Sequence, residues 1–368
     1  MKKGKNSPDF IVFIVTLVLL SVGLIMVFSS SITTSYLRHG GDALHYVKRQ
    51  GMWAGIGLLA MFSVMKMDLH RVRKLTGPAL IGGYLLLVLV LIPGIGTEIK
   101  GSSRWLGVGP LSFQPSEVMK LIMVFFMAHS LSRHQHTIKL FLKGLMPHLV
   151  ILGLTSGLIL LQPDLGTTIA IAGTTYIMFI AGGVKGTHLG GLALLGLVAI
   201  AGAIAIAPYR MERFTTFLNP WADPTDAGFQ IIQSLYAIGS GGFAGLGLTN
   251  SKQKYFYLPE QHTDFIFAII GEELGFIGTT MILALFLIFA WRGIKIALTA
   301  PDGFYCLLAV GITSMIVLQA IINIGVVTGS MPVTGITLPF ISHGGSSLVW
   351  TLIGVGLLLN ISKYTTTK

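Results

Sequence analysis

Cysteine and charge are the two scarcest features of this sequence. One cysteine, Cys306, occurs among 368 residues, so no disulfide bond can form within the chain. Cys306 lies in an apolar stretch, which favours a small buried residue over a catalytic thiol. Charged residues make up 11% of the chain, whereas soluble globular proteins carry about a quarter. Together with 53% hydrophobic residues, this composition predicts a protein that lies largely within a lipid bilayer.

The sequence also lacks the signatures of several enzyme and binding classes. It contains no Walker loop, no dinucleotide-binding fingerprint and no His-Glu-x-x-His zinc motif. The ten histidines are scattered, so neither ATP-driven transport nor a structural zinc site is expected. The net charge of +11 comes mostly from short loops beside apolar segments, where basic residues set topology and contact anionic lipid. No interleaved basic and aromatic surface is evident, so we expect no nucleic-acid partner.

Long apolar segments dominate what is present. Backbone groups in lipid must be hydrogen-bonded within their own segment, so each such segment is predicted to be a helix. The predicted fold is all-α: a polytopic integral membrane protein with about ten transmembrane helices, forming a single domain over residues 1–368. The predicted spans are 10–29, 50–66, 77–94, 115–131, 145–161, 165–183, 188–207, 264–291, 304–327 and 347–361.

The distribution of lysine and arginine predicts the orientation of these spans. The first span follows a basic stretch and is too long for a signal peptide, so it is expected to be retained. Positive residues are denser in the loops on the side of the N-terminus, which places both termini in the cytoplasm. The large loop 208–263, before the eighth span, is then extracytoplasmic, and its length suggests a function. We expect a multi-pass protein of the cytoplasmic membrane.

Ionisable residues inside spans are costly, so they mark functional or paired positions. Glu117 and Lys120 lie near the outer start of the fourth span. Their i, i+3 spacing places them on one helix face, where they form an ion pair, a cavity wall, or both. Asp164 follows a proline at the start of the sixth span. It is interpreted either as a helix cap or as an acidic group facing a cavity.

Three further carboxylates belong to the eighth span. Asp264 lies at its outer start, either as a first-turn residue favoured by the helix dipole or as a general base at the water–lipid boundary. Glu272 and Glu273 lie two turns deeper and point about 100° apart. We expect at least one of them to pair within the bundle.

The outer segment 328–346 is too apolar for a solvated loop and contains too many prolines and glycines for a helix. It is predicted to be re-entrant, which is tolerated where protein or water covers the backbone. Residues 344–347, Gly-Gly-Ser-Ser, open the last span, and exposed N–H groups there are suited to phosphate. A plain glycine turn is the simpler interpretation of that motif alone.

Seven stretches together resemble the SEDS family (shape, elongation, division and sporulation), which comprises FtsW, RodA and SpoVE. They run in the family's order across nearly the whole chain, and the stretch from Pro259 is most similar to the FtsW and SpoVE branch. The stretches are Arg104-Trp105-Leu106-Gly107, Gln114-Pro115-Ser116-Glu117 with Lys120, Gln162-Pro163-Asp164-Leu165-Gly166-Thr167, Phe229-Gln230-Ile231-Ile232-Gln233-Ser234, His262-Thr263-Asp264-Phe265-Ile266-Phe267, Gly271-Glu272-Glu273-Leu274-Gly275 and Pro332-Val333-Thr334-Gly335-Ile336-Thr337-Leu338-Pro339.

The resemblance implies a peptidoglycan glycosyltransferase that polymerises lipid II on the outer face of the membrane, for septal or spore-cortex synthesis. The family's catalytic carboxylate falls on Asp264, which would deprotonate the acceptor 4-hydroxyl, with inversion at the donor carbon. The resemblance also implies a divalent cation, Mg²⁺ or Mn²⁺, with no organic cofactor. Its implied partners are lipid II, undecaprenyl-linked glycan, a class B penicillin-binding protein, and other membrane proteins of division, elongation or sporulation.

A diphosphate leaving group requires positive charge or metal nearby. The outer-side candidates for contact with substrate or pyrophosphate are Arg104, Arg210, Arg213, Lys254, His262 and Ser346. The metal ligands are not predicted.

Crosslinking, lipid transport and a purely structural role are the other activities to consider. Residues 251–254 spell Ser-x-x-Lys, but without a folded domain around them we expect no crosslinking in the chain itself. A lipid II flippase is a second interpretation, with Glu117, Lys120 and Asp164 along its path. A non-catalytic scaffold for the penicillin-binding protein is a third, in which Asp264 serves as a cap.

Overall fold

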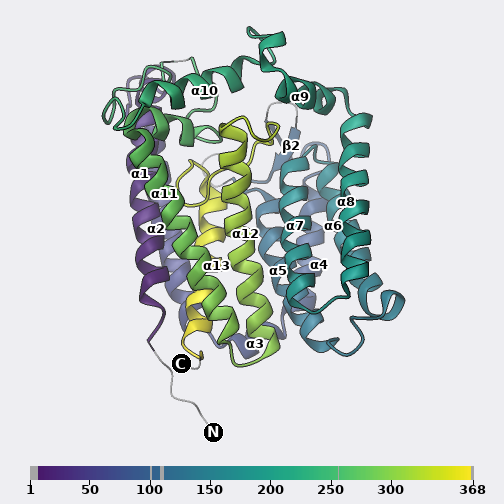
Figure 1. The fold of residues 1–368 in the computed structure, drawn as a ribbon. Coiled ribbons are helices and arrows are strands. Elements are labelled where there is room, and N and C mark those ends of the chain that lie inside the picture. The colour runs from purple at the N-terminus through teal and green to yellow at the C-terminus, as the bar shows by residue number, and fades with distance from the viewer. Residues whose placement is uncertain (1–6, 100–101, 108–111, 256, 366–368) are drawn as a thin grey trace.

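The computed structural model describes residues 7–99, 102–107, 112–255 and 257–365, and it is a bundle of long helices (Figure 1). Ten helices within this described part correspond one to one to the predicted spans, so the all-α prediction is confirmed. They are α1 (Phe10–Arg38), α2 (His45–Lys66), α4 (Thr76–Leu89), α5 (Pro115–Arg133), α6 (Met146–Leu160), α7 (Leu165–Ala181), α8 (Gly186–Ile206), α11 (Ile266–Leu298), α12 (Gly303–Val327) and α13 (Gly345–Ser362).

Length and composition identify many of these helices as membrane-spanning. Six helices of the described chain are long and apolar enough to cross a bilayer, if the π-helical turn Phe141–Leu145 is counted as part of α6. They are α1, α6, α8, α11, α12 and α13. Helices α4 and α7 are shorter but also apolar, and α5 carries the charges of Glu117 and Lys120 in its first two turns. The chain is therefore a multi-pass membrane protein.

Two helices extend well beyond their predicted ends. Helix α1 continues to Arg38 instead of ending at 29, and α11 continues to Leu298 instead of 291. Apolar character marks the part of a helix that lies in lipid, but a helix continues wherever its polar residues find partners. Ser29 illustrates this, because it is buried and its hydroxyl donates to the Glu273 carboxylate at 2.6 Å.

The large loop 208–263 contains helices that the sequence analysis did not anticipate. Helices α9 (Pro208–Leu218) and α10 (Phe229–Gly241) are joined by a 3₁₀ turn at Pro220–Ala222, and both lie across one end of the bundle (Figure 1). Strands β1 (Thr97–Ile99) and β2 (Ser102–Trp105) form an antiparallel hairpin in the loop between α4 and α5. Positions 100–101 and 108–111 of that loop lie outside the described residues.

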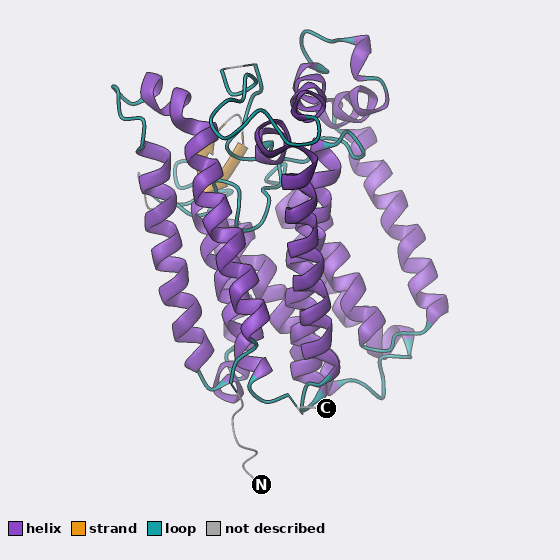
Figure 2. Ribbon diagram, turned by 60° about the vertical axis from the view of Figure 1, so that its left-hand side comes forward, coloured by secondary structure: helices purple, strands orange, loops and turns teal. Residues whose placement is uncertain are grey.

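The beginning of α1 and the end of α13 meet at the opposite end of the bundle (Figure 2). The Asp9 amide donates to the Ser362 hydroxyl at 2.9 Å, and the Asp9 carboxylate pairs with Arg292 at 2.5 Å. The short helix α3 (Leu69–Arg73) lies at this end as well. Both ends of the bundle-forming chain therefore lie on one side, as the topology prediction requires.

Helix α12 is the centre of the bundle and α8 is at its edge. Helix α12 packs against α5, α7, α11 and α13, and more than half of its residues are buried. Helix α8 contacts α7 and α9 and has no buried residue, so most of its surface is left for lipid. A side chain on α12 is consequently held by neighbours on several sides.

Helix α11 bends at Gly275, which has a φ of +64° and a ψ of −160°. The loop that follows α10 packs into this bend. A Cβ added to Gly275 would lie 2.3 Å from the Gly245 nitrogen, which is closer than any side chain can approach. The bend thus fixes the outer part of α11 against α10, and with it the segment that precedes α11.

The bend predicts that Gly275→Ala destabilises the protein. The positive φ alone costs on the order of 1–3 kcal/mol for a residue with a Cβ, and the clash with Gly245 adds to it. We expect a lower melting temperature of the detergent-solubilised protein. Gly196→Ala on α8 is the matched control, because nothing lies within 4 Å of its added Cβ. Equal melting temperatures for the two variants would contradict this account of the bend.

Candidate active site

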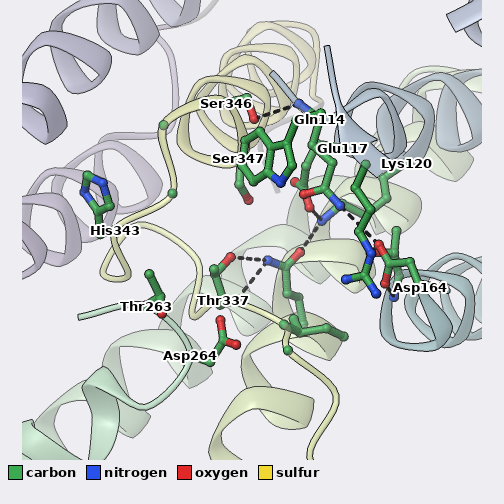
Figure 3. A pocket seen from close by; sticks show the side chains of 18 of the residues that line it. Gln114, Glu117, Lys120, Asp164, Thr263, Asp264, Thr337, His343, Ser346 and Ser347 are labelled. Atoms are coloured by element: carbon green, nitrogen blue, oxygen red, sulfur yellow. Dashed lines mark hydrogen bonds and ion pairs between the residues drawn. The ribbon is translucent and has the colours of Figure 1, made fainter. Parts of the chain in front are cut away.

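A polar cavity of about 330 Å³ lies near the end of the bundle that carries α9 and α10. It is formed by α2, β2, α5, α7, α12, the start of α13, the residues before α11, and the segment before α13. The predicted site residues that line it come from five separate parts of the chain (Figure 3). They are Arg104, Glu117, Lys120, Asp164, Asp264 and Ser346.

Glu117 and Lys120 form the predicted ion pair on the wall of this cavity. Helix α5 starts at Pro115, so both residues lie in its first two turns and their side chains meet, with 2.9 Å between Lys120 Nζ and Glu117 Oε1. Both are nearly buried, and Lys120 Nζ also donates to Gln319 Oε1 at 2.6 Å. The pair is therefore both a structural contact and a cavity wall.

Asp164 also satisfies both of its interpretations. It is the N-cap of α7, where its carboxylate accepts from the Thr167 amide at 3.0 Å and the Thr167 hydroxyl at 2.8 Å. The same carboxylate lines the cavity and accepts from Gln114 Nε2 at 3.1 Å. Arg104 donates to the backbone oxygens of the two residues before Asp164, at 2.9 and 2.5 Å. This turn is thereby fixed at the cavity edge.

Asp264 lies just outside the helix that it was predicted to begin. Helix α11 starts at Ile266 with Phe265 as its N-cap, so Asp264 is not a first-turn residue. Its half-buried side chain projects into the space shared with Glu117, Lys120 and Asp164 (Figure 3). This position favours the general-base interpretation of Asp264 over the helix-dipole interpretation.

The segment 328–346 contains no helix between the end of α12 and the start of α13, and its centre is covered by protein. Leu338, Phe340 and Ile341 are buried, and the Phe340 carbonyl lies so close to Gly23 of α1 that a Cβ there would be 2.4 Å away. The predicted irregular and protein-covered backbone is thus present. Whether the segment re-enters the bilayer remains a prediction.

Amide side chains from the helices satisfy the backbone of this segment, and the sequence analysis missed them. Gln50 of α2 donates to the Ser342 carbonyl at 3.1 Å, and Gln319 of α12 donates to the Thr337 carbonyl at 3.0 Å. Asn323, also on α12, donates to the Ile336 carbonyl at 2.7 Å. Gln319 and Asn323, two amides one turn apart inside the apolar helix α12, are the signal that identifies these positions, whereas Gln50 follows Lys48 and Arg49 and is not marked in this way.

His262 lies beside the cavity instead of lining it. Its ring packs against Tyr46 with 4.6 Å between centroids, and its backbone oxygen accepts from the His343 amide at 2.9 Å. His343 does line the cavity. Burial, reinforced by the positive charges of His262, Arg49 and His45, lowers the pKa of His343 to about 3. The His343 imidazole is therefore neutral near pH 7.

Arg210 and Arg213 line a second, smaller cavity of about 80 Å³ between α7, α8 and α9. Arg213 is exposed and donates to the Val333 carbonyl at 3.3 Å. Arg104 lines both cavities, so the smaller cavity adjoins the larger one at that residue. Apolar side chains of α7 and α8, including Ile169 and Ile200, line it together with Tyr209 and Phe214 of α9 and the segment 332–334.

The family model described as "Cell cycle protein", FtsW/RodA/SpoVE, matches residues 10–367. This chain belongs to the FtsW/RodA/SpoVE family. Stage V sporulation protein E of Bacillus subtilis (strain 168) is 52% identical over 364 residues, covering 99% of each chain. The probable peptidoglycan glycosyltransferase FtsW of Geobacter sp. (strain M18) is 44% identical over 355 residues, covering 96% of each.

Two solved structures share the fold of this family member. A chain in the structure described as "Structural coordination of polymerization and crosslinking by a peptidoglycan synthase complex" has 32% identity and a TM-score of 0.80, with 96% and 97% of the two chains covered. The rod shape determining protein RodA of Thermus thermophilus has 29% identity and a TM-score of 0.72, with 98% of each chain covered. The predicted resemblance to the family is confirmed.

Lys254 is not placed where the prediction required it. Its side chain is 1% exposed and lies outside both cavities, so it cannot contact a pyrophosphate in either. Instead, Lys254 Nζ pairs with Glu273 Oε1 at 3.2 Å and donates to the Thr249 carbonyl. An unpaired buried carboxylate is strongly destabilising, whereas a solvated loop is stable without a lysine. The pairing with Glu273 therefore explains the inward position of Lys254.

Glu272 and Glu273 attach the loop after α10 to α11 in this family member. Glu272 accepts from the amides of Lys252 and Gln253 at 2.8 and 3.3 Å, and from the Ser251 hydroxyl at 2.5 Å. Glu273 holds Lys254. The predicted pairing of at least one of these carboxylates within the bundle is confirmed.

The donor groups of the cavity suit a divalent cation that also takes ligands from its substrate. Among the described residues, no three histidine, cysteine, aspartate or glutamate side chains gather into a metal site. Four carboxylates line the cavity: Glu117 is paired with Lys120, Asp164 accepts from Gln114 and Thr167, and Glu260 and Asp264 lie in the segment before α11. Mg²⁺ is commonly held by one or two carboxylates together with substrate phosphate oxygens, so the residues present fit such an ion.

The buried Lys254–Glu273 pair predicts a rescue experiment. Lys254→Met leaves Glu273 as an uncompensated buried carboxylate, which costs about 3–5 kcal/mol of stability. The double variant Lys254→Met/Glu273→Gln removes both charges and should recover most of the lost melting temperature. A double variant less stable than Lys254→Met alone would contradict the pairing.

Proposed function

We propose that this chain is a peptidoglycan glycosyltransferase that polymerises lipid II, with Asp264 as the general base. The observation that carries this proposal is the position of Asp264. It is a half-buried carboxylate outside any helix, projecting into a polar cavity of about 330 Å³. The curated FtsW relative is named a probable peptidoglycan glycosyltransferase and matches 96% of this chain.

The proposed reaction is a single displacement. The Asp264 carboxylate accepts the proton of the acceptor 4-hydroxyl, and that oxygen forms a bond to C1 of the donor sugar. The bond from C1 to the diphosphate oxygen breaks, and undecaprenyl diphosphate leaves with the electron pair. Attack opposite the leaving group inverts the configuration at C1, because no covalent enzyme intermediate intervenes.

Arg104 is the best-placed arginine for the diphosphate. It lines both cavities, and its hydrogen bonds to the Gln162 and Pro163 carbonyls use Nε and Nη2, so the guanidinium has further N–H donors for a ligand. Arg210 and Arg213 lie around the smaller cavity, whose apolar wall suits the first isoprene units of the lipid. Ser346, in the first turn of α13, lines the larger cavity, and its hydroxyl accepts from the Gln114 amide at 3.3 Å. His262 does not line the cavity but contacts His343, which does, through its backbone oxygen and its ring.

A divalent cation, Mg²⁺ or Mn²⁺, is part of this proposal. Asp264 and Glu260 would hold it together with oxygens of the substrate. When bound, such an ion neutralises charge that develops on the leaving diphosphate.

The cavity end of the bundle faces the outside of the cell in this proposal. Positive residues are denser in the loops at the other end, where the chain begins and ends. Substrates carried by a lipid in the outer leaflet would reach the cavity from that side.

A class B penicillin-binding protein is the proposed partner. The described chain has no transpeptidase domain, and one similar structure is a complex that couples polymerization to crosslinking. The similarity to the sporulation protein of Bacillus subtilis and to FtsW favours spore-cortex or septal synthesis, alongside other membrane proteins of those processes.

The structure disfavours the flippase interpretation. On the side of Lys120 that faces away from the cavity, side chains such as Met123, Val124 and Met315 fill the space between α5, α7 and α12. The described residues leave no room there for a water molecule. The polar cavity therefore opens toward the end of the bundle that carries α9 and α10, and packed side chains close it beyond the Glu117–Lys120 pair.

Replacing the base tests the activity directly. Asp264→Asn keeps the shape of the side chain but cannot accept the proton, so polymer formation from purified lipid II with Mn²⁺ should fall about 10²- to 10⁴-fold. The assay contains a class B penicillin-binding protein, and polymer is measured per folded protein. Asp302→Asn is the control, because Asp302 caps α12 at the other end of the bundle and asparagine also caps. Wild-type yield from Asp264→Asn would refute the base assignment.

Arg104→Gln tests the diphosphate contact. Loss of a charged hydrogen bond to the ligand should raise the KM for lipid II about tenfold or more. Arg133→Gln, in the last turn of α5 at the far end of the bundle, should leave the KM unchanged. Equal KM values for the two variants would remove Arg104 from the binding site.

A further inference from the structure

Two amide side chains of α12 lie one turn apart and hold consecutive residues of the segment before α13. Asn323 Nδ2 donates to the Ile336 carbonyl at 2.7 Å, and Gln319 Nε2 donates to the Thr337 carbonyl at 3.0 Å. Their i, i+4 spacing places both on the same face of α12. Asn323 is 1% exposed, so it contributes to the site through its hydrogen bonds instead of by contact with a ligand.

Asn323 makes a second hydrogen bond from the same nitrogen. Asn323 Nδ2 also donates to the backbone oxygen of Asp264 at 2.7 Å. One side chain therefore joins three parts of the chain: the central helix α12, the residue before α11, and the irregular segment at Ile336. Gly335, the neighbour of Ile336, lies directly against the Asp264 carboxylate, because a Cβ added to it would be 3.6 Å from Oδ2.

The backbone around Asp264 depends on such contacts because no helix holds it. The carbonyls of His262 and Thr263 accept from the His343 amide and the Ser342 hydroxyl, at 2.9 and 2.7 Å. Those two donors belong to the same irregular segment, which has no regular structure of its own. Asn323 connects this arrangement to α12, which packs against four other helices of the bundle.

We propose that Asn323 is a positioning residue for the glycosyl transfer, holding Asp264 at the depth and angle needed to reach the acceptor hydroxyl. This inference rests on the proposed function of Asp264 as the general base. A base acts within hydrogen-bond reach of its proton, and a misplacement of about 1 Å lowers the rate about 100-fold. The binding of lipid II does not require the same precision, so Asn323 affects turnover and leaves affinity unchanged.

Asn323→Asp is the sharpest variant. It preserves the size of the side chain but replaces the donating NH₂ group with a carboxylate oxygen, which repels the carbonyls of Asp264 and Ile336. The chain offers a matched control at Asn360 of α13, which is also 1% exposed. Asn360 Nδ2 likewise donates to two backbone carbonyls, of Val64 at 2.9 Å and Met67 at 2.7 Å, but at the opposite end of the bundle.

Both variants of the full chain are assayed for glycan polymerisation from purified lipid II with Mn²⁺ and a class B penicillin-binding protein. Rates are normalised to the folded fraction from a melting curve. We expect Asn323→Asp to lower kcat about 100-fold with KM within twofold of wild type, and Asn360→Asp to retain wild-type kcat. Wild-type kcat for Asn323→Asp, or an equal loss of kcat in both variants, would overturn the proposal.

A second variant covers the case in which Asn323→Asp does not fold. Asn323→Ala removes both hydrogen bonds without adding charge and should lower kcat about tenfold with unchanged KM. Wild-type kcat for a folded Asn323→Ala protein would overturn the positioning role. Asp264→Asn distinguishes a failure of the proposed function from a failure of the positioning role. An active Asp264→Asn variant would refute the assignment of Asp264 as the general base. An inactive Asp264→Asn variant together with a fully active Asn323→Ala variant would refute only the positioning role of Asn323.

Discussion

A charged or polar side chain inside a membrane bundle persists only where the protein supplies its partner, and this constraint organises the whole site. Lys120 is held by Glu117 and by Gln319, so a cation and an anion coexist on the cavity wall at little net charge. The same requirement draws Lys254 inward to Glu273, away from solvent. Each polar group so paired is also held in place, and the result is a cavity with several polar side chains in defined positions on its wall.

The helices of the core hold the irregular backbone of the site in place. The site residues come from helix ends, strand β2 and irregular segments, and part of that irregular backbone is anchored to helices of the core. Gln50, Gln319 and Asn323 hold backbone carbonyls of residues 336, 337 and 342, and Asn323 extends the same support to Asp264. Amides suit this task because they donate to a carbonyl without the cost of burying a charge.

The helices were predictable from the sequence because each segment that lies in lipid must itself be apolar, and this pattern is visible within about 20 consecutive residues. All ten predicted spans correspond to helices, and the Glu117–Lys120 contact follows from helical spacing alone. Contacts between distant parts of the chain were not predictable in this way. The burial of Lys254 depends on a carboxylate nineteen residues away, across a loop whose path no periodicity reveals. Asn323 escaped notice because a neutral amide disturbs an apolar pattern less than a charge does.

The central claim is that the acceptor sugar binds in the cavity with its 4-hydroxyl beside Asp264. A structure of the protein with a non-reactive lipid-linked disaccharide tests it most directly. The account predicts a distance of roughly 2.6–3.2 Å between an Asp264 carboxylate oxygen and the acceptor 4-oxygen, with the diphosphate of the donor toward Arg104. A ligand bound outside this cavity, or an acceptor oxygen beyond the reach of Asp264 even through one water molecule, would contradict it.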